Sequence, residues 1–294
     1  MHTPYDGSAR LFTISARPID PAGWIEVDDR LPQYLDEKAR LFESRPDDVF
    51  AAEADTEAAQ AEVLALLVEH LVLRFPGTYR RNGGFIEIVP AGRRVALDDP
   101  AVPPLRAAAM LVAEDLAIMR RDAAGWRLAA GAVCFPSSWR LREKAGRPIE
   151  QVHGPVPGFG AGTRGAELIT RMFDSMQPGN VALRWNWSLY GNDHLHHPDD
   201  QPPRRFGGGG RADPVFLRVE RQTLRKLPQS GDIVFTIGIH LDPLEALSRH
   251  PEGGTIAGAL MVQIAALDEA QLAYKGLTAE RERLLARLRE IAER

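Results

Sequence analysis

The segment from Asp213 to Pro228 constrains the fold most, because its pattern predicts one long strand that carries charged side chains on one face. Successive side chains of an extended chain alternate between two faces. One face therefore holds Val215, Leu217 and Val219, and the other holds Phe216, Arg218, Glu220, Gln222 and Leu224. The polar face of a half-exposed antiparallel strand often has this composition. Alone, the pattern fits either a solvent-exposed face or the wall of a polar site.

A second segment, Val181 to Tyr190, repeats this pattern, because its large apolar side chains alternate with Arg184, Asn186 and Ser188. It predicts another strand with a polar face. Two such strands side by side could line one pocket.

The remaining periodicity predicts an α+β protein with an antiparallel sheet flanked by helices. Strands are expected at residues 126–135, 181–190, 215–224 and 233–241, with an early hairpin near 80–97. Helices are expected at residues 55–76, 104–121, 138–145, 164–176 and 267–291, the last as one helix or a pair. Prolines break residues 1–50 into short pieces, which predicts an N-terminal wrap. The core is then residues 51–250, and residues 251–294 form a C-terminal helical extension.

Composition excludes several classes of function. The 294 residues carry a net charge of −4 and contain no dense basic block, which argues against a nucleic-acid partner. The opening residues lack a basic leader and an apolar stretch, and no run reaches the roughly 18 apolar residues of a membrane span. We therefore expect a cytoplasmic protein without a membrane partner. Glycine-rich nucleotide-binding motifs are also missing from the sequence.

The single cysteine, Cys134, cannot form an internal disulfide, a zinc finger or a cysteine-bound iron–sulfur cluster. A buried cysteine in a strand is the default interpretation. A thiolate ligand to iron is the alternative.

Among the eight histidines, His153 lies in the most rigid setting, because Pro155 and Pro157 follow it closely. Such a backbone could hold an imidazole ring as an axial metal ligand. A turn histidine that hydrogen-bonds to a loop carbonyl group fits the sequence equally well. His240, at the end of a strand, is a second candidate ligand.

A further cluster of histidines lies near acidic residues, which superficially suggests a metal site. It comprises Asp193, His194, His196, His197 and Asp199. Because prolines and four glycines follow, a solvated loop is the preferred interpretation.

Several blocks, in order, resemble the alpha subunit of haem-dependent oxidative N-demethylase, the dimethylamine-oxidising enzyme, and its relatives. They are residues 126–139, 144–157, 184–187 and 218–228, followed by Phe235-Thr-Ile. The resemblance spans roughly Trp24 to Leu247. It implies a haem-binding fold of PAS type and NADPH-dependent oxidation of a small secondary amine with O2.

Carried onto this sequence, the resemblance implies that His153 ligates haem iron, with His240 as the alternative. Glu220 would pair with the substrate ammonium ion, since an unpaired cation in a pocket of low dielectric constant is costly. Arg218, Gln222 and Arg184 would donate hydrogen bonds to bound oxygen or to the haem propionates. Arg221 is a further cofactor-binding candidate, although its side chain is expected on the other face, where it could fix the strand.

The resulting functional prediction is a haem b monooxygenase component that demethylates a small amine. The sequence lacks the cysteines of an iron–sulfur cluster and a recognisable flavin site, so a separate reductase or electron-transfer subunit would carry NADPH, flavin and iron–sulfur chemistry. Two alternatives stay open: a haem, gas or small-ligand sensor of PAS type, and a haem-less binding or scaffold protein. Where relatives are expected to carry an aromatic residue, this sequence has Gly238-Ile-His240, which leaves the identity of the substrate open.

Overall fold

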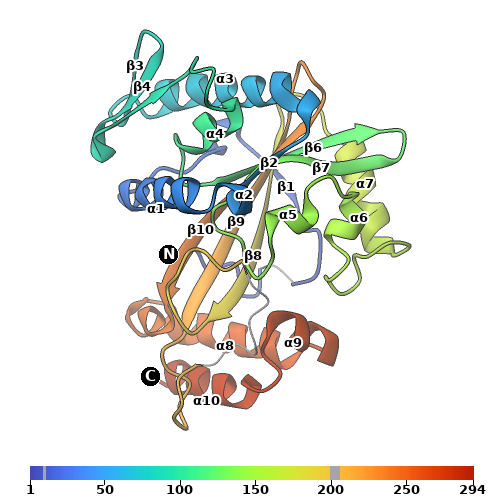
Figure 1. Cartoon of the computed structure of the whole chain (residues 1–294). Coiled ribbons are helices and arrows are strands. Elements are labelled where there is room, and N and C mark those ends of the chain that lie inside the picture. The colour runs from blue at the N-terminus through green and yellow to red at the C-terminus, as the bar shows by residue number, and fades with distance from the viewer. Residues whose placement is uncertain (9–10, 199–205) are drawn as a thin grey trace.

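A seven-stranded antiparallel sheet forms the centre of the computed structural model, which describes residues 1–8, 11–198 and 206–294 (Figure 1). Across the sheet the strand order is β1-β8-β9-β10-β6-β7-β2. These strands are β1 (Arg17–Ile19), β2 (Phe50–Ala52), β6 (Asp115–Asp122), β7 (Gly125–Ala132), β8 (Val181–Tyr190), β9 (Phe216–Lys226) and β10 (Ile233–Pro243). A smaller sheet consists of β3 (Tyr79–Asn82), β4 (Phe85–Ile88) and β5 (Arg93–Ala96).

Helices surround the central sheet, as Figure 1 shows. They are α1 (Leu31–Ser44), α2 (Pro46–Val49), α3 (Glu57–Arg74), α4 (Pro104–Ala109), α5 (Leu141–Lys144), α6 (Ile149–Val152), α7 (Arg164–Ser175), α8 (Gly253–Ala265), α9 (Glu269–Lys275) and α10 (Arg281–Ala292). Short 3₁₀ turns lie at Pro21–Gly23, Ala54–Thr56, Val89–Ala91 and Leu244–Arg249. The predicted α+β class with an antiparallel sheet is therefore confirmed.

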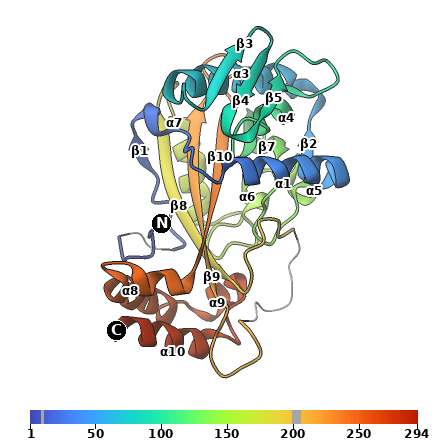
Figure 2. The ribbon, with the colours of Figure 1, turned by 90° about the vertical axis from the view of Figure 1, so that its left-hand side faces the viewer.

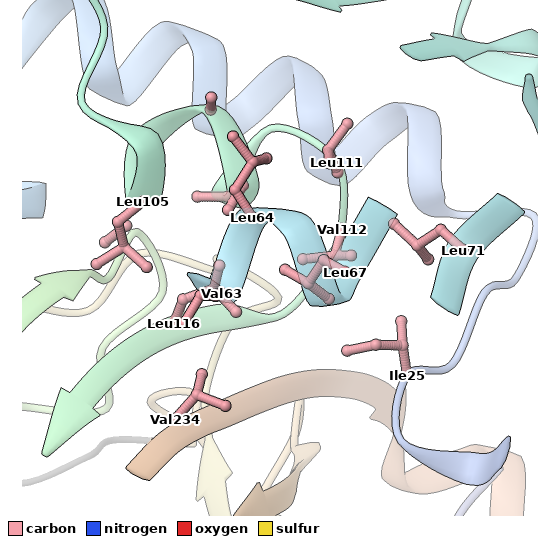
Figure 3. Close-up of a cluster of buried hydrophobic side chains, with 14 of the residues drawn as sticks. Ile25, Val63, Leu64, Leu67, Leu71, Leu105, Leu111, Val112, Leu116 and Val234 are labelled. Carbon is pink, nitrogen blue, oxygen red and sulfur yellow. The ribbon is translucent and has the colours of Figure 1, made fainter. Parts of the chain in front are cut away.

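One face of the sheet packs against α3 and α4 in the main hydrophobic core (Figure 3). The apolar side chains of α3 recur at helical spacing, so that Val63, Leu67 and Leu71 meet Val234 of β10 and Leu116 of β6 in one buried cluster. Burial of each such side chain contributes about 1.5–3 kcal/mol. This packing fixes the sheet from one side and leaves its other face available for a site.

The other face of the sheet turns toward α6 and α7. Here Met119 of β6 and Leu224 of β9 share a cluster with Ile149 of α6 and with Ile169 and Phe173 of α7. A third cluster lies where the C-terminal helices meet β8 and β9, and there Leu217 and Val219 pack with residues of α8 and α10 (Figure 2).

The predicted helix over residues 104–121 is wrong in its second half. Helix α4 ends at Ala109, and β6 begins at Asp115 and pairs with both β10 and β7. Both faces of β6 are covered, since Leu116 and Ile118 face the main core while Ala117 and Met119 face α6 and α7. A strand buried on both faces has a continuous apolar run that sequence periodicity does not distinguish from a buried helix.

The predicted helical tail is a pair, because the chain turns at Gly276, whose φ is +67°, between α9 and α10. The helix expected at residues 138–145 is reduced to the single turn α5. In the described part of the chain, no single helix has both the length and the apolar composition to cross a membrane. Helices α8 and α9 together have this length and composition, but they are bent by 117° relative to each other. The domain boundaries at residues 50 and 250 stay a prediction.

Candidate functional site

A cavity of about 760 Å³ lies between the sheet and helices α6 and α7. Most of its lining is apolar, and it includes Met119, Leu224 and Phe235 from the sheet and Ile169 and Phe173 from α7. Sites for small molecules and cofactors are of this size and composition, at about 300–1,000 Å³ with a few placed polar groups. The polar groups of the lining therefore decide what it can bind.

The two polar strands lie side by side, and their polar faces form one wall of this cavity. Strands β8 and β9 pair so that Arg184 lies opposite Gln222 and Asn186 lies opposite Glu220. All four residues and Ser188 line the cavity. The pocket suggested by the two strand patterns is thus present.

Glu220 is the acidic group at the centre of this wall, and it is almost completely buried. Its Oε2 atom accepts hydrogen bonds from Asn186 Nδ2 at 3.1 Å and from Gln222 Nε2 at 2.7 Å. Its Oε1 atom accepts none from any described residue. The Oε1 atom of Gln222 is also buried without a hydrogen bond in the described structure. This part of the wall has acceptor capacity for a cation that carries N–H groups.

Lys275, which the sequence analysis did not identify, extends this hydrogen-bond chain from α9. Its buried Nζ atom donates to Asn186 Oδ1 at 3.1 Å and to the Trp187 carbonyl oxygen at 2.6 Å. Because an ammonium group can only donate, Asn186 must present Oδ1 to Lys275 and Nδ2 to Glu220. Gly276 marks the end of the helix in the sequence, but no local signal shows that Lys275 points inward.

Arg184 brings a positive charge to the cavity without an ion-pair partner among the described residues. Its Nε atom is buried and makes no hydrogen bond there. Burial lowers the pKa of its guanidinium, and the charge of Glu220 opposes that effect. A half-buried guanidinium with no anionic partner among the described residues is costly, so this position favours an anionic ligand group.

His153 lines the same cavity directly after α6, where its ring is held by the backbone. Its Nδ1 atom lies 3.1 Å from the Ile149 carbonyl oxygen, so Nδ1 carries the proton and donates. Burial lowers the pKa of His153 to about 4, which keeps the ring neutral. Its Nε2 atom makes no hydrogen bond to a described residue. A neutral ring with an anchored Nδ1–H and a free Nε2 is the usual state of a metal-ligating histidine.

Arg218 does not join this group, although it is on the same strand as Glu220. Its fully buried guanidinium donates to the carbonyl oxygens of Phe135 at 2.7 Å and Leu195 at 3.1 Å. It also lies 5.6 Å from the Tyr190 ring. These contacts attach the loops at Phe135 and Leu195 to β9, and Arg218 is not part of the cavity lining.

Arg221 and His240 lie on the opposite face of the sheet. Arg221 donates to the Trp24 carbonyl oxygen at 3.0 Å and forms an ion pair with Glu26 at 3.0 Å. His240 lies beside Glu26 and His2, in a second cavity. The structure therefore separates His240 from His153, and it brings only His153 to the cavity that contains Glu220.

The histidines at 194–197 do not form a set of metal ligands among the described residues; Asp199 lies outside those residues. His196 Nδ1 hydrogen-bonds to the Cys134 carbonyl oxygen at 2.7 Å, and the segment also accepts the hydrogen bonds of Arg218. These hydrogen bonds attach the segment to the body of the protein, while Asp193 and His194 are exposed. Cys134 is fully buried just after β7, and burial strongly raises the pKa of its thiol.

Comparison with known families gives one match over nearly the whole chain. The family model described as "Haem-dependent oxidative N-demethylase, alpha subunit-like" matches residues 15–285. This range contains the cavity residues from both polar strands, His153 and Lys275.

Proposed function

Since this chain belongs to the haem-dependent oxidative N-demethylase, alpha subunit-like family, we propose that its large cavity binds haem b and a small secondary amine for oxidative N-demethylation. One observation carries this proposal: within a lining that is mostly apolar, the cavity combines a histidine nitrogen, a guanidinium and a carboxylate oxygen that have no hydrogen-bond or ion-pair partner among the described residues. The apolar walls suit a porphyrin face, and each polar group suits one part of the cofactor or substrate.

The residues present fit the cofactor. His153 would ligate the iron through Nε2, because its Nδ1–H is already bound to the Ile149 carbonyl group. Arg184 would pair with a propionate, an anionic partner that its guanidinium does not find among the described residues. When bound, haem would supply the activation of O2 that hydroxylates an N-methyl group, and the carbinolamine would then break down to formaldehyde and the smaller amine.

Glu220 would hold the substrate. A secondary ammonium ion has two N–H donors and needs a negative partner in a cavity of low dielectric constant. The Oε1 atom of Glu220 can accept one of these hydrogen bonds, while Asn186 and Gln222 hold Oε2 in place. The apolar neighbours exclude water around the methyl groups, so that the protein contributes orientation and polarity.

The fold and the family support two further parts of the proposal. Five consecutive strands, β6 to β10, form one antiparallel sheet with β6 between β10 and β7, and helices flank it, as in a PAS-type haem-binding domain. The family name implies a partner subunit, and we propose that it or a separate reductase delivers electrons from NADPH through flavin and iron–sulfur centres.

The absorption spectrum tests the cofactor assignment. Protein expressed with ample haem should show a Soret band that weakens or shifts in His153→Ala. The matched control is His240→Ala, which lies on the opposite face and should keep the wild-type spectrum. A wild-type protein that shows no Soret band even after addition of hemin would refute the haem proposal.

Oxygen consumption tests the reaction and separates an enzyme from a sensor. With a chemical or protein reductant, dimethylamine should stimulate O2 consumption and release formaldehyde. Glu220→Gln should raise KM for the amine and leave the Soret band in place. A haem-loaded protein that consumes no O2 with any small secondary amine would favour the sensor alternative.

A further inference from the structure

A second cluster of titratable groups lies on the other face of the sheet, away from His153 and Glu220. His2, Glu26 and His240 each offer one potential ligand atom, and these three atoms lie within 4.8 Å of one another. They form the one such cluster within residues 1–8, 11–198 and 206–294. Because its members are far apart in the sequence, only the folded chain assembles it.

The two distances from Glu26 to the histidines match the edges of a coordination polyhedron. Glu26 Oε2 lies 3.0 Å from His2 Nε2 and 3.5 Å from His240 Nε2. With metal–ligand bonds of about 2.0–2.2 Å, adjacent ligand atoms are about 3.3–3.6 Å apart in a tetrahedral site and about 2.8–3.1 Å apart in an octahedral site. Glu26 Oε2 therefore already lies at about the ligand–ligand spacing of a metal site from both imidazoles, whose own ligand atoms lie within 4.8 Å of one another.

Outer contacts orient the carboxylate of Glu26. Its Oε1 atom forms an ion pair with Arg221 Nε at 3.0 Å, which leaves Oε2 turned toward the two histidines. Outer polar contacts to a ligating carboxylate are usual in metal sites, since they fix the ligand. Ring contacts hold His2, whose centroid is 4.7 Å from that of Trp185 and 4.5 Å from that of His240.

Arg30 competes with a metal ion for this arrangement. Its Nη2 atom lies 3.1 Å from His240 Nδ1, which must accept, so Nε2 of His240 carries the proton and faces Glu26. Metal binding at Nε2 would shift this proton to Nδ1, and Arg30 would have to turn away. Asp28 already accepts from Arg30 Nε at 3.0 Å and from Nη2 at 2.8 Å, so the guanidinium keeps an ion-pair partner when it moves.

A cavity of about 460 Å³ adjoins the cluster and gives access to it. Besides the three potential ligands, Asp28 and Asp242 line this cavity. Two imidazoles and one carboxylate are the donor set of zinc and of non-haem iron, whereas Ca²⁺ and Mg²⁺ prefer oxygen ligands. We propose that His2, Glu26 and His240 bind one divalent first-row transition-metal ion, with its open positions toward this cavity.

Co²⁺ and Zn²⁺ titrations test the proposal on haem-free full-length protein, without a histidine tag and after chelator treatment. Wild type should bind one equivalent of Co²⁺ at this site with a visible ligand-field spectrum, and Zn²⁺ should displace it. His2→Gln and His240→Gln should each weaken this binding at least about tenfold. The matched control is His194→Gln, which removes an exposed histidine outside the cluster and should bind as wild type does.

Arg30→Gln gives a second, opposite readout, because removing the competing donor and its positive charge should tighten Co²⁺ binding. Circular dichroism of each variant checks that it is folded, and His2→Gln changes only a half-exposed residue next to the N-terminus. The proposal is overturned if wild type binds no metal, or if both His2→Gln and His240→Gln bind it as wild type does. These results do not depend on haem or on the amine reaction.

Discussion

Replacing Lys275 with Met removes the buried ammonium group that fixes Asn186 beside Glu220. Among the described residues, the hydrogen bonds to Asn186 Oδ1 at 3.1 Å and to the Trp187 carbonyl oxygen at 2.6 Å are lost. Hydrogen bonds to charged groups contribute about 1.5–3 kcal/mol each. Met avoids the cost of burying a charge, but it loses the cation–π contacts of Nζ with the Phe12 and Trp187 rings, each at 5.7 Å. We therefore expect the free energy of unfolding to fall by about 3 kcal/mol. This is the lower end of the summed contribution of the two hydrogen bonds, because Met no longer has to bury a charge.

A double-mutant cycle isolates the bond between Lys275 and Asn186. Lys275→Met also loses the bond to Trp187, and Asn186→Ala also loses the bond to Glu220, but the two single variants share only the bond at 3.1 Å. The double variant should therefore be more stable than additivity predicts by about 1.5–3 kcal/mol. Urea unfolding of the four proteins measures this coupling energy. A coupling within about 0.5 kcal/mol of zero would refute the chain of hydrogen bonds.

The same variants connect the hydrogen-bond chain to the proposed reaction. Without Lys275, only the acceptor Glu220 Oε2 still orients the Asn186 amide, and Asn186 Oδ1 loses the donor that held it in place, so Asn186 positions Glu220 less firmly. Lys275→Met should raise KM for the amine more than it lowers kcat, and it should leave the haem spectrum unchanged. A lost Soret band would instead indicate that α9 supports the cofactor pocket as a whole.

The remaining predictions concern stability. Lys38→Met should cost about 3–5 kcal/mol in urea unfolding, because fully buried Lys38 donates to three backbone carbonyl groups and lies 4.0 Å from the buried Asp115 carboxylate; a loss below about 1 kcal/mol would contradict this. Burial raises the pKa of Asp115 to about 6, so the folded state holds this proton more tightly than the unfolded chain. The stability of wild type relative to Asp115→Asn should thus fall by up to about 3 kcal/mol as the pH rises from about 4 to about 7, and a constant difference would refute this. Gly165→Ala should cost about 1–3 kcal/mol, since its Cβ would lie 2.3 Å from the Gly158 carbonyl oxygen; unchanged stability would show that α7 shifts freely.

The alternation of polar and apolar side chains between the two faces of β8 and β9 was predictable, because side-chain direction in a strand depends only on the local backbone. The sequence therefore indicated that Arg184 and Asn186 share a face, and that Glu220 and Gln222 share one. The sequence did not show that Glu220 lines the cavity while Arg218 does not, because an even number of positions separates them on β9 and both are therefore expected on the same face. In the folded chain, the loops at Phe135 and Leu195 supply the carbonyl oxygens to which Arg218 donates, and these contacts keep Arg218 out of the cavity.

By itself, the sequence determined the α+β class, the two polar strands and the resemblance that the family match bears out. Only the tertiary structure decided that β6 is a strand and that Lys275 reaches Asn186. It also placed His153 and His240 on opposite faces of the sheet. The physical reason is that periodicity records which side chains share one face of one element. Which elements then meet depends on contacts between distant segments, and no local pattern encodes these contacts.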